Sequence, residues 1–345
     1  MSTQLGVIMQ SEIAEIPEVF RRLKEQSAAM ASAIAKLPLA EVDSVILVAR
    51  GTSDNAALYL KYLIETKIGI PCGLASPSVV SIYGTKLRFK KVLVIALSQS
   101  GQSPDLVGYC KAAREGGATV LAMTNDPESP LALSSNCHLY LHAGPEKAVA
   151  ATKSYSAELL VSRIFVATWS GESIDLDSII EQSEKALDCA DQIKLIAEAF
   201  DFSQGITTMG RGYAYSNAHE AALKIQETVK IPVASFSSAD YLHGPISSLH
   251  ANSRVIFLAP FGIAESAMAA TVERIRDITS HIFWIGSGFS RRSSEIYLGG
   301  STTLAEADGV IADSLLLQLF ALFLAISSGQ NPDAPIGLAK VTKTL

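Results

Sequence analysis

Hydroxyl and amide side chains crowd residues 98–103, where the chain reads SQSGQS. The apolar run Val92 to Leu97 before them predicts a strand buried on both faces of a parallel sheet. Pro104 and Asp105 after them predict the first turn of a helix. Such a junction leaves backbone N–H groups at the positive end of a helix dipole, where an anion is favoured. The alternative is a polar loop with Ser caps, but this loop holds more donors than capping needs. We therefore favour anion binding.

A second junction of the same kind follows the strand predicted at Val45–Val48. Gly51 permits a tight turn after that strand. Thr52 or Ser53 can then cap the helix predicted from Asn55 to Thr66. In an open parallel sheet both junctions lie at the carboxyl ends of their strands, where ligands bind.

The strand, turn and helix recur in the second half of the chain. A strand at Ile206–Met209 precedes Arg211, which matches Arg50, and a helix from Ser216 to Val229 follows. This recurrence indicates a duplicated domain. The strand at Val255–Ala259 is followed by PFG rather than by the Ser-Gln loop, so only the first half keeps the anion loop. Further short strands are predicted at Cys72–Ala75, Ala118–Met123, His138–Leu141, Ile282–Ile285 and Thr302–Leu304.

The chain is therefore expected to be an α/β protein with two parallel-sheet domains. We expect a helical arm at residues 1–40, a first domain at 41–175, a second domain at 200–328 and a tail at 329–345. A pair of linker helices is expected within 171–202. The tail is rich in Pro and Gly, and a structureless tail of this length is typically disordered or functional.

Composition excludes several classes of function. A net charge of −6 argues against nucleic acid or an anionic membrane as the main partner. We expect a cytoplasmic protein, because no signal peptide is evident and the apolar run Leu315 to Ile326 is too short to span a bilayer. The four cysteines are widely spaced, as is typical of buried thiols in a reducing compartment. No metal or cofactor is expected, since HEAAL lacks the second His of a zinc motif and GRG lacks the third Gly of a dinucleotide motif.

Several motifs in order resemble the sugar isomerase (SIS) family of double domains: VARGTS, LSQSGQSPD, EKAVAATKS, AHEAALKIQE followed by YLHGP, and NPDAPIGLAKVTKT. The resemblance covers about residues 40–345. It is strongest to the isomerase half of glucosamine-6-phosphate synthase and to the glucosamine-6-phosphate deaminases of the same fold. It implies two tandem SIS domains, each a flavodoxin-like αβα sandwich.

The resemblance also implies a substrate site. It assigns the sugar phosphate to residues of the two junctions, namely Ser98, Gln99, Ser100 and Ser103, helped by Thr52 or Ser53. It places Val149 and Ala150 near the sugar. The implied ligand is a phosphorylated amino sugar.

The resemblance assigns the chemistry to three residues. Glu227 matches the carboxylate that moves a proton between C1 and C2, and Glu220 and Lys224 can share its helical face. His243 matches the ring-opening histidine that the neighbouring subunit supplies, which implies a homodimer. Lys340 matches the tail lysine that closes over the sugar. Each residue also has an ordinary alternative: a surface Glu, a turn His, a solvated Lys or an i, i+4 helix pair.

The expected activity follows from a comparison with the synthase. Its amidotransferase half needs an N-terminal cysteine nucleophile, whereas position 2 here is Ser2. We therefore expect an ammonia-releasing enzyme that converts glucosamine 6-phosphate and water to fructose 6-phosphate and ammonia. A fructosamine-phosphate deglycase and a galactosamine-6-phosphate deaminase/isomerase are the alternative enzymes. A phosphosugar-sensing regulator is the alternative of another class, although it need not retain Glu227, His243 and Lys340.

Overall fold

The computed structural model describes residues 5–335, 337 and 340, which form two compact units. The N-terminal sheet unit comprises residues 18–146, 153–175 and 340. The C-terminal sheet unit comprises residues 5–17, 147–152, 176–335 and 337. Segment 147–152 and the beginning of the helical arm therefore belong to the C-terminal sheet unit, which sequence order alone does not indicate.

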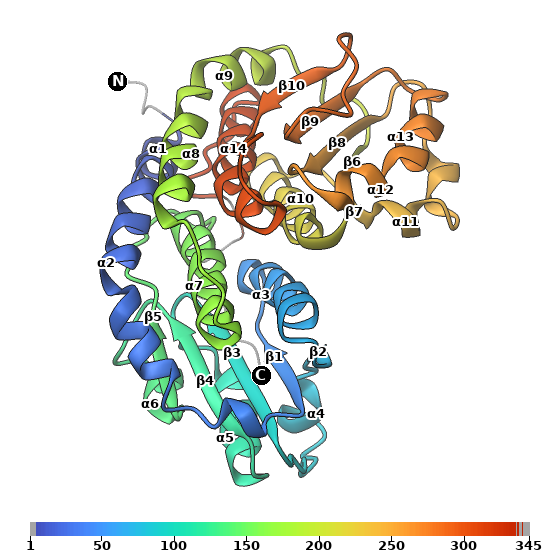
Figure 1. Ribbon diagram of the computed structural model, residues 1–345. Coiled ribbons are helices and arrows are strands. Elements are labelled where there is room, and N and C mark those ends of the chain that lie inside the picture. Colours follow the sequence, from blue (N-terminus) through green and yellow to red (C-terminus); the bar gives the residue numbers. More distant parts are fainter. Residues whose placement is uncertain (1–4, 336, 338–339, 341–345) are drawn as a thin grey trace. The chain divides into compact units, whose positions relative to one another are not determined.

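The N-terminal sheet unit contains five parallel strands in the order β2-β1-β3-β4-β5 (Figure 1). They are β1 (Ser44–Val48), β2 (Cys72–Leu74), β3 (Val92–Ser98), β4 (Thr119–Thr124) and β5 (Cys137–Tyr140). This is the flavodoxin-like order, in which the chain reverses direction across the sheet between β1 and β3. Val48 lies opposite Ala96, so the loops that follow β1 and β3 leave the same edge of the sheet at that switch point.

Successive side chains of β3 point to opposite faces of the sheet, and helices cover both of these faces. Val94 and Ala96 pack with Leu106 and Cys110 of α5. The opposite face meets α3, which packs on α7. The helical elements of the unit are α2 (Ile16–Ile34), η1 (Leu39–Glu41), α3 (Thr52–Leu63), the π-helical η2 (Ile64–Ile68), α4 (Ser78–Ser81), α5 (Pro104–Glu115), α6 (Pro130–Ser134) and α7 (Lys153–Ser170).

The C-terminal sheet unit repeats this plan with the order β10-β9-β8-β6-β7, again all parallel. Its strands are β6 (Ile206–Gly210), β7 (Val233–Ser237), β8 (Arg254–Ala259), β9 (Ile282–Gly286) and β10 (Ile296–Gly299). The strand predicted at Thr302–Leu304 is wrong: that segment is a turn in which Ser301 Oγ accepts two backbone N–H groups. The two parallel five-stranded sheets agree with the predicted fold class.

One face of the second sheet packs on α13 and the other on α10 and α14. The predicted linker pair forms two helices, α8 and α9, which pack on α14. The helical elements are α1 (Val7–Ala14), α8 (Leu176–Asp188), α9 (Ala190–Glu198), η3 (Gly212–Ala214), α10 (Tyr215–Val229), α11 (Ser238–Tyr241), η4 (Pro245–Ser248), α12 (Ile263–Ala267), α13 (Ala269–Arg276) and α14 (Glu306–Ser327).

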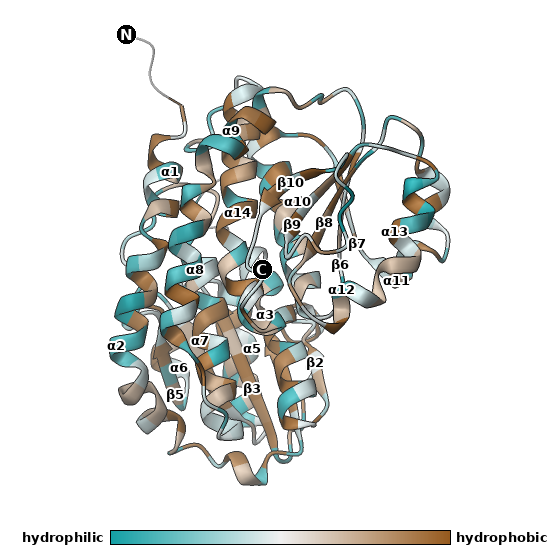
Figure 2. Ribbon diagram, turned by 45° about the horizontal axis from the view of Figure 1, so that its top comes forward, coloured by the Kyte–Doolittle hydropathy of each residue, from teal (hydrophilic) through white to brown (hydrophobic). Residues whose placement is uncertain are grey.

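The helix α14 begins more than two turns before the predicted start at Leu315. Its length and hydropathy would suit a membrane span, but 94% of its most apolar window is buried. Figure 2 shows that α14 is brown around most of its circumference, as is typical of a helix enclosed by other elements. We therefore interpret α14 as the core helix of its unit.

Candidate functional site

The Ser-Gln loop follows β3 and ends at the N-terminus of α5, as the sequence predicts. Ser98 Oγ accepts the Gly101 N–H at 3.1 Å, and Ser100 Oγ accepts the Gln102 N–H at 3.3 Å. Each hydroxyl therefore acts as an acceptor within the loop and retains its own O–H as a donor. Ser103 occupies the N-cap of α5 without a side-chain capping bond. The loop thus presents hydroxyl donors beside a helix N-terminus, which is an arrangement suited to phosphate.

The conformation of this loop is fixed by Gly101 and by the loop after β4. Gly101 has φ +62°, and a Cβ there would lie 2.3 Å from the Oγ of buried Ser129. The Gln99 carbonyl accepts the Asn125 N–H at 3.0 Å, and the Gly101 carbonyl accepts the Leu131 N–H at 3.2 Å. Only glycine fits the Gly101 position without strain. The donors are therefore positioned before a ligand arrives.

An ion pair joins the two junctions at the switch point. Arg50, after β1, donates to buried Asp105 in the first turn of α5, with N···O distances of 3.0 and 2.9 Å. Both guanidinium nitrogens contact the same carboxylate oxygen, Oδ2, while Oδ1 accepts the Leu106 N–H, so the position of the carboxylate is fixed as well as its charge. Without Arg50 the Asp105 carboxylate would repel an anion at this helix N-terminus. The sequence analysis noted both residues but assigned neither of them this role.

The helix of the second junction, α3, is not capped as the sequence predicts. Gly51, with φ +56°, is the N-cap residue of α3, and no side-chain capping bond is present. The capping prediction for Thr52 or Ser53 is therefore wrong. Buried Ser53 donates its hydroxyl to Glu158 Oε1 of α7 at 2.7 Å, whereas Thr52 is half-buried at the start of α3. Of the two side chains, that of Thr52 is the more exposed.

The predicted shared face on α10 is present in the C-terminal sheet unit. Lys224 Nζ lies 3.4 Å from Glu220 Oε1 and 2.5 Å from Glu227 Oε2. The side chains of Glu220 and Lys224 are fully buried, and that of Glu227 is 23% exposed. The buried ammonium compensates two carboxylates, so Glu227 is held in a fixed position while part of it remains accessible.

A histidine, His219, lies next to this cluster in the sequence of α10. His219 precedes Glu220 on α10, and its ring packs against Tyr215 with centroids 4.4 Å apart. Burial lowers the pKa of His219 below its ordinary value, so its imidazole is neutral at pH 7. His243, in contrast, lies in the exposed turn after α11, where its N–H donates to the Asp240 carbonyl at 3.0 Å.

The segment with Val149 and Ala150 is positioned by a residue that the sequence analysis missed. Buried Glu12 of α1 accepts the Lys147 N–H, and it accepts the Ala148 N–H at 3.2 Å. Val149 is half-buried and Ala150 is buried. Both predicted sugar contacts therefore belong to a segment that the arm helix holds by its backbone.

The tail lysine Lys340 lies in the N-terminal sheet unit. Its Nζ is 2.7 Å from Glu146 Oε2, and the Glu146 side chain is fully buried. Glu146 also accepts the Ser154 N–H at 3.0 Å and the Ser154 hydroxyl at 2.8 Å, at the start of α7. EKAVAATKS contains Glu146, but its partner Lys340 is 194 residues away, so local sequence could not reveal this contact.

Among residues 5–335, 337 and 340, no group of three or more His, Cys, Asp or Glu side chains is arranged to hold a metal ion. The candidate site thus consists of two groups of residues. The hydroxyls of the anion loop lie in the N-terminal sheet unit, and the carboxylates and ammonium group of the α10 cluster lie in the C-terminal sheet unit.

Comparison with known proteins identifies the class. The SIS domain model matches residues 38–168. A proposed phosphosugar isomerase of Silicibacter pomeroyi DSS-3, known from its crystal structure, is 32% identical with a TM-score of 0.83, over 94% of this chain and 99% of that one. The chain belongs to the SIS domain family.

Two further relatives are an aminotransferase and a deaminase. Glutamine–fructose-6-phosphate aminotransferase [isomerizing] of Methanothermobacter thermautotrophicus is 31% identical over 307 residues, which is 88% of this chain and 52% of that protein. The chain therefore spans about half the length of this relative. Glucosamine-6-phosphate deaminase of Thermotoga maritima is 20% identical with a TM-score of 0.73, over 94% of this chain and 99% of that one, and shares the fold.

Proposed function

We propose that this chain isomerises a phosphorylated amino sugar between aldose and ketose and releases its amine. Glucosamine 6-phosphate and water would give fructose 6-phosphate and ammonia. The observation that carries the proposal is Glu227, a partly exposed carboxylate fixed by a buried lysine on α10. Enolisation requires a positioned carboxylate base, and the anion loop supplies the binding energy that orients a phosphosugar.

In this proposal the two junctions bind the phosphate. Ser98 and Ser100 donate their hydroxyls, while Gln99 and Ser103 complete the loop and Thr52 contributes from α3. Each hydrogen bond to a charged acceptor contributes about 1.5–3 kcal/mol. Val149 and Ala150 contact the sugar.

In this proposal His243 and Glu227 carry out the proton transfers. His243 of a neighbouring subunit opens the ring by moving one proton from the C1 hydroxyl and giving one to the ring oxygen. Glu227 then takes the C2 proton and returns it to C1, while O1 gains one proton and the amine nitrogen loses one, so that C1 is reduced to an alcohol and C2 is oxidised to an imine. Water adds to C2 and ammonia leaves. Lys224 and Lys340 stabilise the negative charge that develops on oxygen.

Relatives give precedents for the substrate and the reaction. Fructose 6-phosphate is named for the aminotransferase of M. thermautotrophicus, and glucosamine 6-phosphate deamination is named for the T. maritima protein. Deamination needs only water beside the groups assigned above. We propose a cytoplasmic homodimer as the active form, because the exposed turn at His243 leaves that imidazole accessible to a neighbouring subunit.

Ammonia release against a panel of phosphosugars tests this function. Glucosamine 6-phosphate should be turned over, and glucosamine without phosphate should not. A preference for galactosamine 6-phosphate or for a fructosamine phosphate would replace the substrate assignment. Tight binding of phosphosugars without turnover of any of them would refute the enzyme and favour a sensor.

A further inference from the structure

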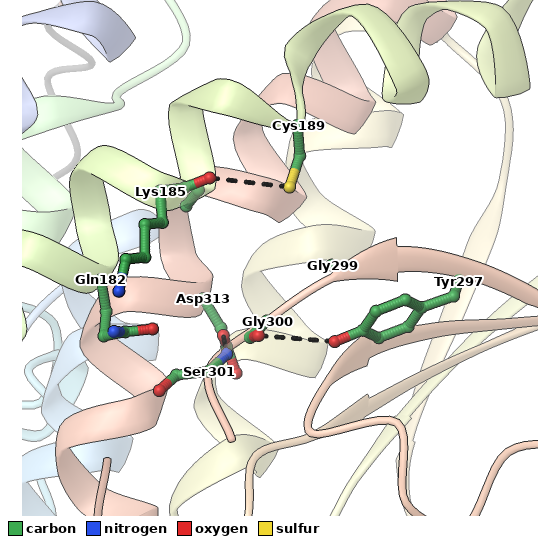
Figure 3. A pocket seen from close by; sticks show the side chains of 9 residues that line it. Gln182, Lys185, Cys189, Tyr297, Gly299, Gly300, Ser301 and Asp313 are labelled. Carbon is green, nitrogen blue, oxygen red and sulfur yellow. Dashed lines mark hydrogen bonds between the residues drawn. The ribbon is translucent and has the colours of Figure 1, made fainter. Parts of the chain in front are cut away.

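A cavity lies in the C-terminal sheet unit. Its volume is about 190 Å³. It is lined by α8, by the end of β10 and the loop after it, and by α14 (Figure 3). The lining side chains with polar groups are Gln182, Lys185, Cys189, Tyr297, Ser301 and Asp313. An apolar cavity of about 150 Å³ accommodates benzene, so this one has room for a small organic molecule.

Asp313 of α14 is the unusual member of the lining. Its side chain is only 2% exposed. Its Oδ1 accepts a long bond of 3.4 Å from the Ser301 N–H, and its Oδ2 has no hydrogen-bond partner in the described part of the chain. A buried carboxyl oxygen without a partner is costly unless a ligand or water pairs with it. Figure 3 shows this carboxyl among the groups that line the cavity.

Three of the donors that line the cavity have partners other than Asp313. Tyr297 donates its hydroxyl to the Gly286 carbonyl at 2.8 Å, and the Cys189 thiol lies 3.7 Å from the Lys185 carbonyl. The Lys185 ammonium pairs with Glu181 at 2.6 Å, and its side chain is 57% exposed. Lys185 and the Gln182 amide also line the cavity, but in the described part of the chain neither pairs with Asp313, whose Oδ2 keeps no partner.

We propose that this cavity binds a small primary amine, whose ammonium group pairs with the Asp313 carboxylate. An ammonium supplies three donors and one positive charge, which suits a buried carboxylate oxygen that has no partner. A neutral apolar ligand would leave Oδ2 without a partner, and an anion would be repelled by the ionised acid. The amine enters as RNH₃⁺, and the carboxyl loses its proton to solvent.

Binding should therefore be linked to proton release. Burial raises the pKa of Asp313 to about 8, with the Ser301 N–H opposing that shift. The other titratable groups that line the cavity are Lys185 and Cys189 on the α8 side and Tyr297 on β10. Burial raises the pKa of Cys189, and it raises that of Tyr297 to about 12. Both groups stay neutral below pH 8, so the released proton comes from Asp313.

Titration calorimetry of the full chain with ethanolamine tests the proposal. We expect binding that releases close to one proton per amine at pH 7, measured in two buffers with different ionisation heats. The affinity should rise about tenfold between pH 6 and pH 7, because one proton is exchanged. Tetramethylammonium, which has the charge but no N–H donors, should bind at least tenfold more weakly.

Two variants and one control locate the site. Asp313→Asn resembles the neutral carboxyl in shape and should lose ethanolamine binding at least tenfold. Ala186→Leu fills the cavity from α8 without changing Asp313 and should have the same effect. Asp191→Asn, an exposed change on α9, should bind as the parent does. Absence of ethanolamine binding to the parent, unchanged binding in Asp313→Asn or Ala186→Leu, or heats that do not depend on the buffer would overturn the proposal.

Discussion

Replacing Lys224 with Met removes the ammonium group that lies between two carboxylates of α10. The Met side chain keeps the length and apolar stem of Lys, so packing changes little. Glu220, which is fully buried, then loses a cation 3.4 Å from its Oε1. Glu227 loses a cation 2.5 Å from its Oε2, but its partial exposure allows water to compensate. The cost of the substitution should therefore arise mainly from Glu220.

Coulomb's law gives the scale of this cost. At 3.4 Å and an effective dielectric constant of about 20, two unit charges attract by roughly 5 kcal/mol. Breaking a buried pair by removing one partner typically costs about 3–5 kcal/mol. We expect Lys224→Met to lower the free energy of unfolding by this amount. The double variant Glu220→Gln with Lys224→Met should recover more than half of the loss, because it leaves no buried charge beside position 224.

Urea unfolding followed by tryptophan fluorescence measures the effect. The chain has two tryptophans, and Trp284 lies in the core of the C-terminal sheet unit, stacked on Phe257. A Trp169→Phe background makes Trp284 the reporter of that unit. Lys194→Met, an exposed change on α9, is the matched control and should alter stability by less than about 0.5 kcal/mol. A loss below about 1 kcal/mol in Lys224→Met, or no recovery in the double variant, would refute the buried ion-pair network.

Three further predictions concern other parts of the chain. The folded-state pKa of Asp313, about 8 against 3.8 for the ordinary carboxyl, means that the folded state retains a proton that the unfolded state has lost. Stability should therefore fall by about 1.4 kcal/mol per pH unit from about pH 4 up to about pH 8 relative to Asp313→Asn, as urea midpoints across that range can check; parallel pH profiles would contradict the shift. Ser98→Ala combined with Ser100→Ala should weaken phosphosugar binding by about 3–6 kcal/mol, measured by calorimetry, with Ser248→Ala as an exposed control; unchanged affinity would place the anion elsewhere. Mixing Glu227→Gln chains with His243→Ala chains should restore part of the activity, because one site of a mixed dimer is intact; no recovery despite subunit exchange would assign both groups to one chain.

Much of the fold could be predicted because its central strands are continuous apolar runs. β1, β3, β8 and β9 are flanked by strands on both sides, and their sequences show this burial directly. The edge strands β7 and β10 are half-exposed, with sequences VASFS and IYLG, so they lack that signal. The sequence therefore gives no prediction for β7, and its prediction for β10 lies a few residues too late in the chain.

The candidate site likewise contains residues that the sequence indicates and residues that it does not. Residues close together in sequence, such as those of the Ser-Gln loop and of the α10 face, carry a local pattern of donors or of helical spacing. Glu12 and Glu146 act through partners 135 and 194 residues away, and nothing in their neighbourhoods distinguishes them from surface acids. The pairing of Arg50 with Asp105 depends on the switch between β1 and β3, which only the sheet order reveals.

Exchange of the C2 hydrogen of glucosamine 6-phosphate with solvent deuterium tests the central claim most directly, because it reports enolisation alone. The parent chain should catalyse this exchange. Glu227→Gln keeps the size and hydrogen-bonding capacity of the side chain but cannot accept the proton, so ligand affinity should persist while exchange falls by about 10²–10⁴-fold. Exchange at the parent rate in Glu227→Gln would contradict the account and direct attention to Glu220. No exchange by the parent chain would contradict the proposed isomerase itself.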